Sequence, residues 1–418
     1  MKRSFEDFAV AGKRQGLATV LLSLLGTIVG ASATIGVADR VFQIGFSAFW
    51  WLGVGAIGLF LQGCFLSERI RELNANTLPD IAHKTVGRKA SLMLALIIVL
   101  SWIGIVAAQF VSIAKILMFL LDGRYEVIVT VIAGMVILYT FLGGQISVVK
   151  TDVVQSVFIA VGIVITFFYL YVVRDGDCQT VFQHVELLSS DFTMFHWVLL
   201  LFVTGGTFFL GPDIISRNLI SKDGRTAKKA VWIASVCLLV FSVVITLISM
   251  WTYYNESVPE GLNPLVYLMK SVLPLPISIL LFLALVSTLI SSADTCLINA
   301  ATIVEHDLFG QKDVRRIRIF VVVIGILALL IALHKTDIIN LLLSAYSIYS
   351  PGIVFPLTVS LLFYKKRRVN EPLWFTAVLV GSVLGGLYSY LDIGYEWFPL
   401  LGMFCSLVIS LIAVRKEK

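Results

Sequence analysis

The sequence predicts an all-α integral membrane protein with about twelve transmembrane helices. Of its 418 residues, 58% are hydrophobic and only 14% are charged, and the mean hydropathy is +0.95. A soluble chain carries roughly 25% charged residues, so this chain lacks enough polar surface to face water. Its apolar stretches are continuous rather than alternating, which excludes an outer-membrane β-barrel. At about 35 residues for a span and its loop, the length allows about twelve spans.

Apolar windows place the candidate spans in order along the chain. They cover roughly residues 17–38, 46–66, 90–121, 127–145, 152–174, 193–215, 228–253, 273–304, 317–334, 338–364, 373–391 and 396–414. We expect no signal peptide before residue 17, because no short apolar core with a cleavage site precedes it. The longest segments between spans, about 175–192 and 254–272, are too short for a catalytic domain. The apolar end of the second is a candidate interfacial helix.

The distribution of lysine and arginine predicts the orientation. Of these 32 residues, 26 lie in the N-terminus, the C-terminus and the loops after even-numbered spans. Five lie in the opposite loops, and Lys115 lies near the outer end of the third span, where it is expected to extend to the interface. The positive-inside rule therefore predicts a multi-pass cell-membrane protein with both termini in the cytoplasm. The basic residues are spread over seven segments, so the pI of about 9.0 does not indicate nucleic acid.

Cysteine and histidine spacing argues against a metalloenzyme or a disulfide-stapled protein. The five cysteines are scattered, and the five histidines show no ligand spacing. No nucleophile–base pair is evident either, so we predict that the protein is not an enzyme. With no large domain outside the membrane, the function is expected to lie within the spans.

Small residues interrupt the first span at mid-membrane depth. The run from Gly26 to Gly36 contains three glycines and several hydroxyl residues, which weaken a helix. An unwound turn would free backbone carbonyls, which suit a hard monovalent cation. The alternative is close helix packing, because Gly26 and Gly30 form a GxxxG pair.

The sixth span is interrupted in a related way. Residues 204–207 read Thr-Gly-Gly-Thr, and residues 211–213 read Gly-Pro-Asp. Interrupted helices at corresponding positions of two halves indicate a transporter built from inverted repeats. A kinked but otherwise ordinary helix is the alternative.

The eighth span combines hydroxyl groups with a carboxylate. Its hydroxyl residues recur at spacings of three and four, which place them on one helix face: Thr288, Ser291, Ser292 and Thr295. Asp294 lies among them, and Asp152 lies at the predicted cytoplasmic start of the fifth span. Ionisable residues inside a membrane span are functional candidates by default. The alternatives are a hydrogen-bonded structural carboxylate for Asp294 and a helix N-cap for Asp152.

Four segments together resemble the sodium:solute symporter family. Residues 143–155 resemble its signature of a glycine pair followed by Thr-Asp-x-x-Gln, and residues 290–307 resemble its second signature, which contains Ala-Asp-Ser-x-Leu. Residues 217–230 are similar to the basic loop after the sixth span, and residues 345–352 to the tenth span. The matches occur in order over nearly the whole chain.

This resemblance implies the leucine-transporter-type fold, with two inverted five-helix repeats (spans 1–5 and 6–10), broken helices 1 and 6, and two peripheral C-terminal helices. The implied division of the chain is a cytoplasmic N-terminus at 1–16, repeats at 17–174 and 193–364, peripheral helices at 373–414 and a cytoplasmic tail at 415–418. Many members have one or two helices before the first core span, and none is expected here.

The resemblance also implies ion sites. The family's shared sodium site falls on the backbone carbonyls of Gly26, Val29 and Thr288 and on the hydroxyls of Ser291 and Ser292. A second sodium, held by some members, would fall on Asp152, Ser291, Asp294 and Thr295. No metal beyond sodium is expected.

The solute site is less clearly marked. The positions that supply polar groups in sugar-transporting members match Ala33, Leu52 and Leu343 here. A sugar needs many paired hydrogen bonds, so these apolar residues disfavour it. An amino acid, a carboxylate or a related metabolite is expected instead. The candidate contacts are Thr27, Gly30, Ser32, Gln109, Thr204, Thr207 and Phe208, with Trp51 and Tyr346 as gates.

The predicted function is sodium-coupled import of a small organic solute by alternating access. One alternative is proton coupling through Asp152 or Asp294. Another is a transporter-like sensor that acts with a separate signalling partner. No obligate protein partner is evident in the sequence, so the expected partners are the solute and the lipid bilayer.

Overall fold

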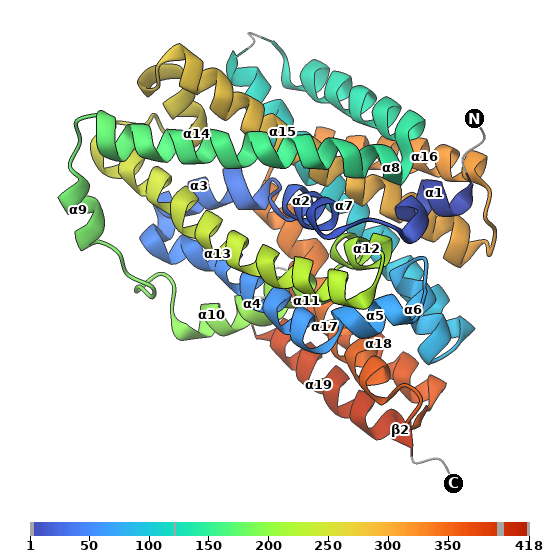
Figure 1. The fold of residues 1–418 in the computed structure, drawn as a ribbon. Helices are drawn as coiled ribbons and strands as arrows, with labels where there is room; N and C mark the ends of the chain where they lie inside the picture. The colour runs from blue at the N-terminus through green and yellow to red at the C-terminus, as the bar shows by residue number, and fades with distance from the viewer. Residues whose placement is uncertain (1–3, 121–122, 391–396, 416–418) are drawn as a thin grey trace.

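The computed structural model describes residues 4–120, 123–390 and 397–415. Figure 1 shows a bundle of long helices, with the N-terminus and the C-terminus of the chain toward the same side. Eight helical stretches in the described residues are long and apolar enough to cross a membrane. Three shorter apolar helices accompany them: Leu17–Ile28, Glu371–Leu387 and Phe398–Ala413. The all-α membrane class is therefore confirmed, whereas the count of twelve spans and the domain boundaries stay predictions.

The first half begins with a short helix, α1 (Phe5–Val10), capped by the Ser4 side chain, and a turn, η1 (Ala11–Lys13). The first broken helix then runs through α2 (Leu17–Ile28), the π-helical turn η2 (Ser32–Gly36) and α3 (Val37–Ile44). The following elements are η3 (Gly45–Phe49), α4 (Trp50–Phe65), α5 (Ser67–Glu72), α6 (Leu78–Thr85), α7 (Arg88–Leu120), α8 (Tyr125–Phe168) and η4 (Tyr169–Val173).

The second half begins after a short outer helix, α9 (Cys178–Gln183). The sixth helix comprises α10 (Met194–Leu200), η5 (Leu201–Gly205), α11 (Gly206–Leu210) and α12 (Pro212–Ile220). The elements that follow are α13 (Gly224–Asn255), α14 (Pro264–Tyr267), η6 (Leu268–Val272), α15 (Leu275–Ile303), η7 (Val304–Leu308), α16 (Val314–His334) and α17 (Ile338–Phe363).

Two further helices, α18 (Glu371–Tyr390) and α19 (Phe398–Ala413), pack on each other and on α17 at one edge of the bundle. Figure 1 shows them at the lower edge, away from α8 and α15. The two-residue strands β1 (Arg368–Val369) and β2 (Val414–Arg415) pair beside them. In the centre, α15 packs against α8, α7 and α2, so the hydroxyl-rich eighth helix faces the broken first helix.

Several helix boundaries in the structure differ from the predicted span ends. Residues 125–168 form two helices joined by a sharp turn at Gly144, where φ is +68° and ψ is 178°, so the second of them begins several residues before the predicted span start at residue 152. Asp152 is therefore a fully buried mid-helix residue, and its interpretation as an interfacial N-cap is wrong. The sixth helix continues to Ile220, beyond the predicted end at residue 215, because Pro212 starts a new helical segment. The apolar end of 254–272 is helical, in α14 and η6, and its interfacial position stays a prediction. Predicted span ends at 121, 391 and 396 and tail residues 416–418 lie outside the described residues.

Candidate functional site

The first helix breaks where the glycine run predicts a break. Val29 ends α2 with φ −91° and ψ 87°, and helical geometry resumes at Ala31. Among the described residues, the backbone carbonyls of Gly26 and Val29 accept no hydrogen bond. Both residues are buried, so these carbonyl oxygens need a partner other than bulk water.

The hydroxyls of α15 lie directly opposite this break. A Cβ on Gly26 would lie 3.0 Å from the Ser291 hydroxyl, and a Cβ on Gly30 would lie 2.7 Å from the Ser292 hydroxyl. The Ser292 hydroxyl donates to the Thr27 carbonyl at 3.0 Å. Close helix packing and an unwound, ion-binding turn are therefore compatible interpretations of the glycines. Close packing of α2 on α15 brings the freed carbonyls next to the α15 hydroxyls. Thr288 is also buried on this helix, and its hydroxyl donates to the Leu285 carbonyl.

Asp152 and Arg217 form a buried ion pair beside this break. One guanidinium nitrogen of Arg217, Nη2, lies 2.9 Å from Asp152 Oδ2, 2.6 Å from Thr295 Oγ1 and 2.7 Å from Thr27 Oγ1. Both charged side chains are 0% exposed. Arg217 therefore joins α12 to α2, α8 and α15. Its interpretation as part of a basic loop is wrong, because α12 carries it into the protein interior.

Two serines complete the coordination of the Asp152 carboxylate. Ser23 and Ser291 each donate a hydroxyl hydrogen bond to it at 2.5 Å. Asp294 is also fully buried, but its Oδ1 lies 3.5 Å from the Thr295 hydroxyl and its Oδ2 has no hydrogen-bond partner among the described residues. The four residues predicted for a second ion are thus close together, and the Arg217 guanidinium lies between them.

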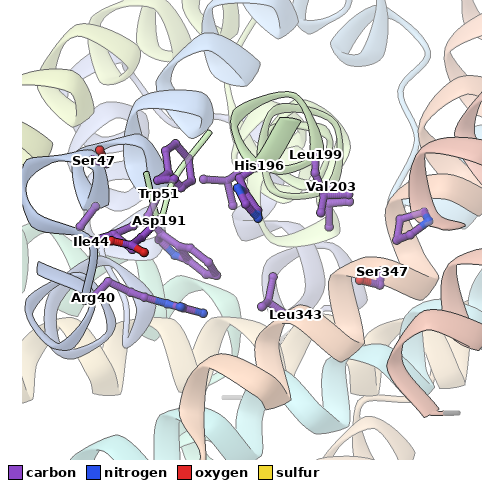
Figure 2. A pocket seen from close by; sticks show the side chains of 14 residues that line it. Arg40, Ile44, Ser47, Trp51, Asp191, His196, Leu199, Val203, Leu343 and Ser347 are labelled. Atoms are coloured by element: carbon purple, nitrogen blue, oxygen red, sulfur yellow. The ribbon is translucent and has the colours of Figure 1, made fainter. Parts of the chain in front are cut away.

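A cavity of about 240 Å³ lies toward the face opposite the termini. Figure 2 shows Arg40 and Asp191 on one side of it and Leu343 and Ser347 on the other. It is lined by Arg40, Ile44, Ser47, Ala48, Trp51, Asp191, Phe192, His196, Leu199, Leu200, Val203, Leu343, Ser347 and Pro399. Charged groups are confined to one end, and the remaining wall is mostly apolar. The Trp51 indole N–H has no hydrogen-bond partner in the described part of the chain.

The residues predicted to contact the solute do not line this cavity. The Gln109 side chain accepts from the Ala31 N–H in the helix break at 3.0 Å. Thr207 shares a hydrogen bond with Ser350 at 2.8 Å, and the Phe208 ring packs against Gly55. Thr204 is fully buried, and its hydroxyl has no hydrogen-bond partner in the residues that the structure describes. Thr27, Gly30 and Ser32 belong to the helix break itself, and Tyr346 is buried in α17. Of the predicted solute and gate residues, the cavity lining contains Trp51.

Lys115 lies beside a second, larger cavity on the same face. This cavity of about 690 Å³ is lined by Lys115 with Asp39, Asp337 and the segment 258–264. The Lys115 side chain is exposed, as its predicted interfacial position requires.

The face that carries the termini is closed by backbone and side-chain contacts. The cavity between α12 and α15 on this side has a volume of only about 10 Å³. Gln15 N–H donates to the Ile220 carbonyl at 3.0 Å, and Arg71 Nε donates to the Ser221 carbonyl at 2.6 Å. Lys13 donates to the Asn74 side-chain oxygen at 2.8 Å, and burial together with nearby Arg71 lowers the pKa of Lys13 to about 8.

Two features were missed by reasoning from the sequence. Arg217 was missed because it was counted with the basic residues that follow it; its position five residues after the Gly211–Pro212 break was the available signal. The cavity was missed because its wall is assembled from α3, η3, α4, the segment before α10, α10, η5, α17 and α19. No local sequence pattern identifies such a wall.

Comparison with known proteins places this geometry in a family. The family model described as "Sodium:solute symporter family" matches residues 8–381. The "Osmoregulated proline transporter OpuE" of Bacillus subtilis (strain 168) is 25% identical, covering 99% of this chain and 90% of that protein. The "Sodium/pantothenate symporter" of Haemophilus influenzae is 26% identical, covering 99% of this chain and 90% of that protein.

Solved structures show the same fold. A Na+-coupled sialic acid symporter in a substrate-bound outward-open state superposes with a TM-score of 0.81 at 16% identity, covering 100% of this chain and 94% of that one. The nucleobase-cation symporter Mhp1 superposes with a TM-score of 0.65 at 14% identity, covering 97% and 93%. The chain belongs to the sodium:solute symporter family and is therefore a membrane sodium-coupled transporter rather than an enzyme.

Proposed function

We propose that the protein imports a small organic solute, an amino acid, a carboxylate or a related metabolite, together with sodium. The observation that carries the ion site is the pair of unpartnered carbonyls of Gly26 and Val29 facing the hydroxyls of Ser291 and Ser292. Oxygen ligands on two different helices suit a hard cation. With the Thr288 carbonyl, these groups form the proposed shared sodium site.

The solute is proposed to enter the cavity lined by Trp51 and Leu343. Its apolar wall disfavours a sugar, whose many hydroxyls would lose hydrogen bonds there. Arg40 and Asp191 at one end favour a solute with one charged head and an apolar body. Relatives are named for transport of proline and pantothenate, which makes these two compounds natural first members of a test library.

The mechanism is proposed to be alternating access. We infer from the positive-inside rule that the face with the termini is cytoplasmic. The structure then corresponds to a state in which the path between α12 and α15 is closed on the cytoplasmic side, with a cavity of about 10 Å³ there and one of about 240 Å³ on the other side. Sodium at the α2–α15 contact would stabilise this state. Opening would separate α12 and α2 from α15 and release both ligands inward.

Uptake into proteoliposomes tests the proposal. We expect solute accumulation driven by an inward sodium gradient, assisted by an inside-negative potential worth about 2.3 kcal/mol per charge per 100 mV. A Ser291→Ala variant should require more sodium for half-maximal uptake. Accumulation that follows a pH gradient without sodium would replace sodium with proton coupling. Solute binding without accumulation under any gradient would favour a sensor.

A further inference from the structure

The second sodium position is already filled by a cation of the protein. The residues predicted for that site are Asp152, Ser291, Asp294 and Thr295. Arg217 Nη2 lies within hydrogen-bond distance of two of them, Asp152 Oδ2 at 2.9 Å and Thr295 Oγ1 at 2.6 Å. Ser291 is joined to the same carboxylate at 2.5 Å. A sodium ion held by these oxygens would have to occupy the space that the guanidinium now takes.

The guanidinium is firmly held in this position. The same nitrogen also donates to the Thr27 hydroxyl at 2.7 Å, and Nη1 donates to the Ser216 hydroxyl at 3.1 Å. The Arg217 side chain is 0% exposed, so it cannot exchange its partners for water without separating the helices. Arginine stays charged at any physiological pH. Because the guanidinium is tethered to the chain, its effective concentration at the Asp152 carboxylate exceeds that of free sodium.

The proposed shared sodium site does not depend on these contacts. It uses carbonyls of the α2 break and the hydroxyl of Ser292, and Arg217 forms no hydrogen bond with any of them in the described residues. Only Ser291 belongs to both groups, and its hydrogen is directed to Asp152. The guanidinium therefore obstructs one position and leaves the other open.

We propose that Arg217 is a built-in cation that replaces the second sodium, so that the protein binds one sodium ion for each solute. This inference rests on the proposed function and concerns its stoichiometry. Removing the guanidinium while keeping Asp152, Asp294 and Thr295 should create room for a second sodium ion. Keeping a positive charge at the position should not.

Equilibrium binding of radioactive sodium to the purified full-length protein tests this. We expect one sodium ion per wild-type chain and a Hill coefficient of about one. Arg217→Gln should bind two, and the double variant Arg217→Gln with Asp152→Asn should return to one. Arg217→Lys, which preserves the charge, should also bind one.

Two outcomes would overturn the inference: two sodium ions on the wild-type chain, including one held at Asp294, or a single ion on a folded Arg217→Gln protein. If Arg217→Gln does not fold, two sodium ions on the wild-type chain or on Arg217→Lys would still overturn the inference. No sodium binding to the wild-type chain at any concentration would instead contradict the proposed function.

Discussion

Two buried regions of this protein handle polar groups in opposite ways. Between α2, α8, α12 and α15, charges are dense, and the Asp152 carboxylate has partners on both oxygens. Around the cavity lined by Trp51, most of the wall is apolar, and the indole N–H has no hydrogen-bond partner among the described residues. The Asp152 cluster suits a fixed network of charges that links helices. The cavity suits a binding site in which the solute supplies the hydrogen-bond acceptor for the Trp51 N–H.

The largest effect is expected from removing the guanidinium. Arg217→Met would leave Asp152 buried without its opposite charge, which costs about 3–5 kcal/mol of folding stability. Thermal unfolding in detergent would measure the loss. As a matched control, the double variant Arg217→Met with Asp152→Leu should recover much of the stability, since it leaves no unpaired charge. A single variant as stable as wild type would show that Arg217 does not link these helices.

The contact between α2 and α15 is sensitive to one methyl group. A Cβ added by Gly30→Ala would lie 2.7 Å from the Ser292 hydroxyl, too close for a normal contact. We expect a loss of about 1–3 kcal/mol and weaker sodium binding, measured by unfolding and by sodium titration. Gly134→Ala is the control, because an added Cβ there meets nothing within 4 Å. Equal behaviour of the two variants would argue against close packing at the ion site.

The unpartnered indole offers a milder test of the solute region. Trp51→Phe keeps an aromatic ring but removes the N–H donor, whose hydrogen bond to a solute is worth about 0.5–1.5 kcal/mol. Solute affinity should fall about two- to tenfold, as measured by competition binding. Trp50→Phe serves as the control, because the Trp50 N–H already donates to the Leu187 carbonyl at 2.8 Å. Unchanged affinity in Trp51→Phe would place the solute elsewhere.

The smallest effect is expected at the face that carries the termini. The pKa of Lys13 is lowered to about 8, so the folded protein releases this proton before the unfolded chain does. Stability should therefore rise slightly as the pH increases above about 8, because the unfolded chain then binds more protons. Melting temperatures of wild type and Lys13→Met from pH 7 to pH 9.5 would measure this. Lys229→Met, at an exposed position, should keep the wild-type pH dependence.

Reasoning from the sequence worked best where one helix carries the whole signal. The membrane class and the breaks in helices 1 and 6 agree with what local composition predicts, whereas the position of the α15 hydroxyls opposite Gly26 and Gly30 was implied only by the family resemblance. The breaks follow from glycine, proline and hydroxyl spacing, which act within a few residues. Most of the sequence could therefore be assigned to helices before their packing was known.

Features that depend on several elements were not predicted. Arg217 follows the helix 6 break and precedes a cluster of basic residues, so sequence alone does not distinguish a buried ion pair from a loop cation. The helix position of Asp152 was predicted incorrectly because the turn at Gly144 starts its helix several residues before the predicted start at residue 152. The predicted solute-contact residues do not line the cavity, whose wall is formed only by tertiary packing.

Sodium-specific stabilisation tests the proposed ion site most directly. Melting temperatures would be compared in sodium and potassium at equal ionic strength for wild type, Ser292→Ala and Ser410→Ala, a buried serine of peripheral α19. A ligand at a hundredfold its dissociation constant stabilises the folded state by about 2.7 kcal/mol. We expect a sodium-specific rise in wild type and Ser410→Ala and a reduced rise in Ser292→Ala. A wild-type protein that melts identically in both salts, or an unaltered response in Ser292→Ala, would contradict a sodium site between α2 and α15.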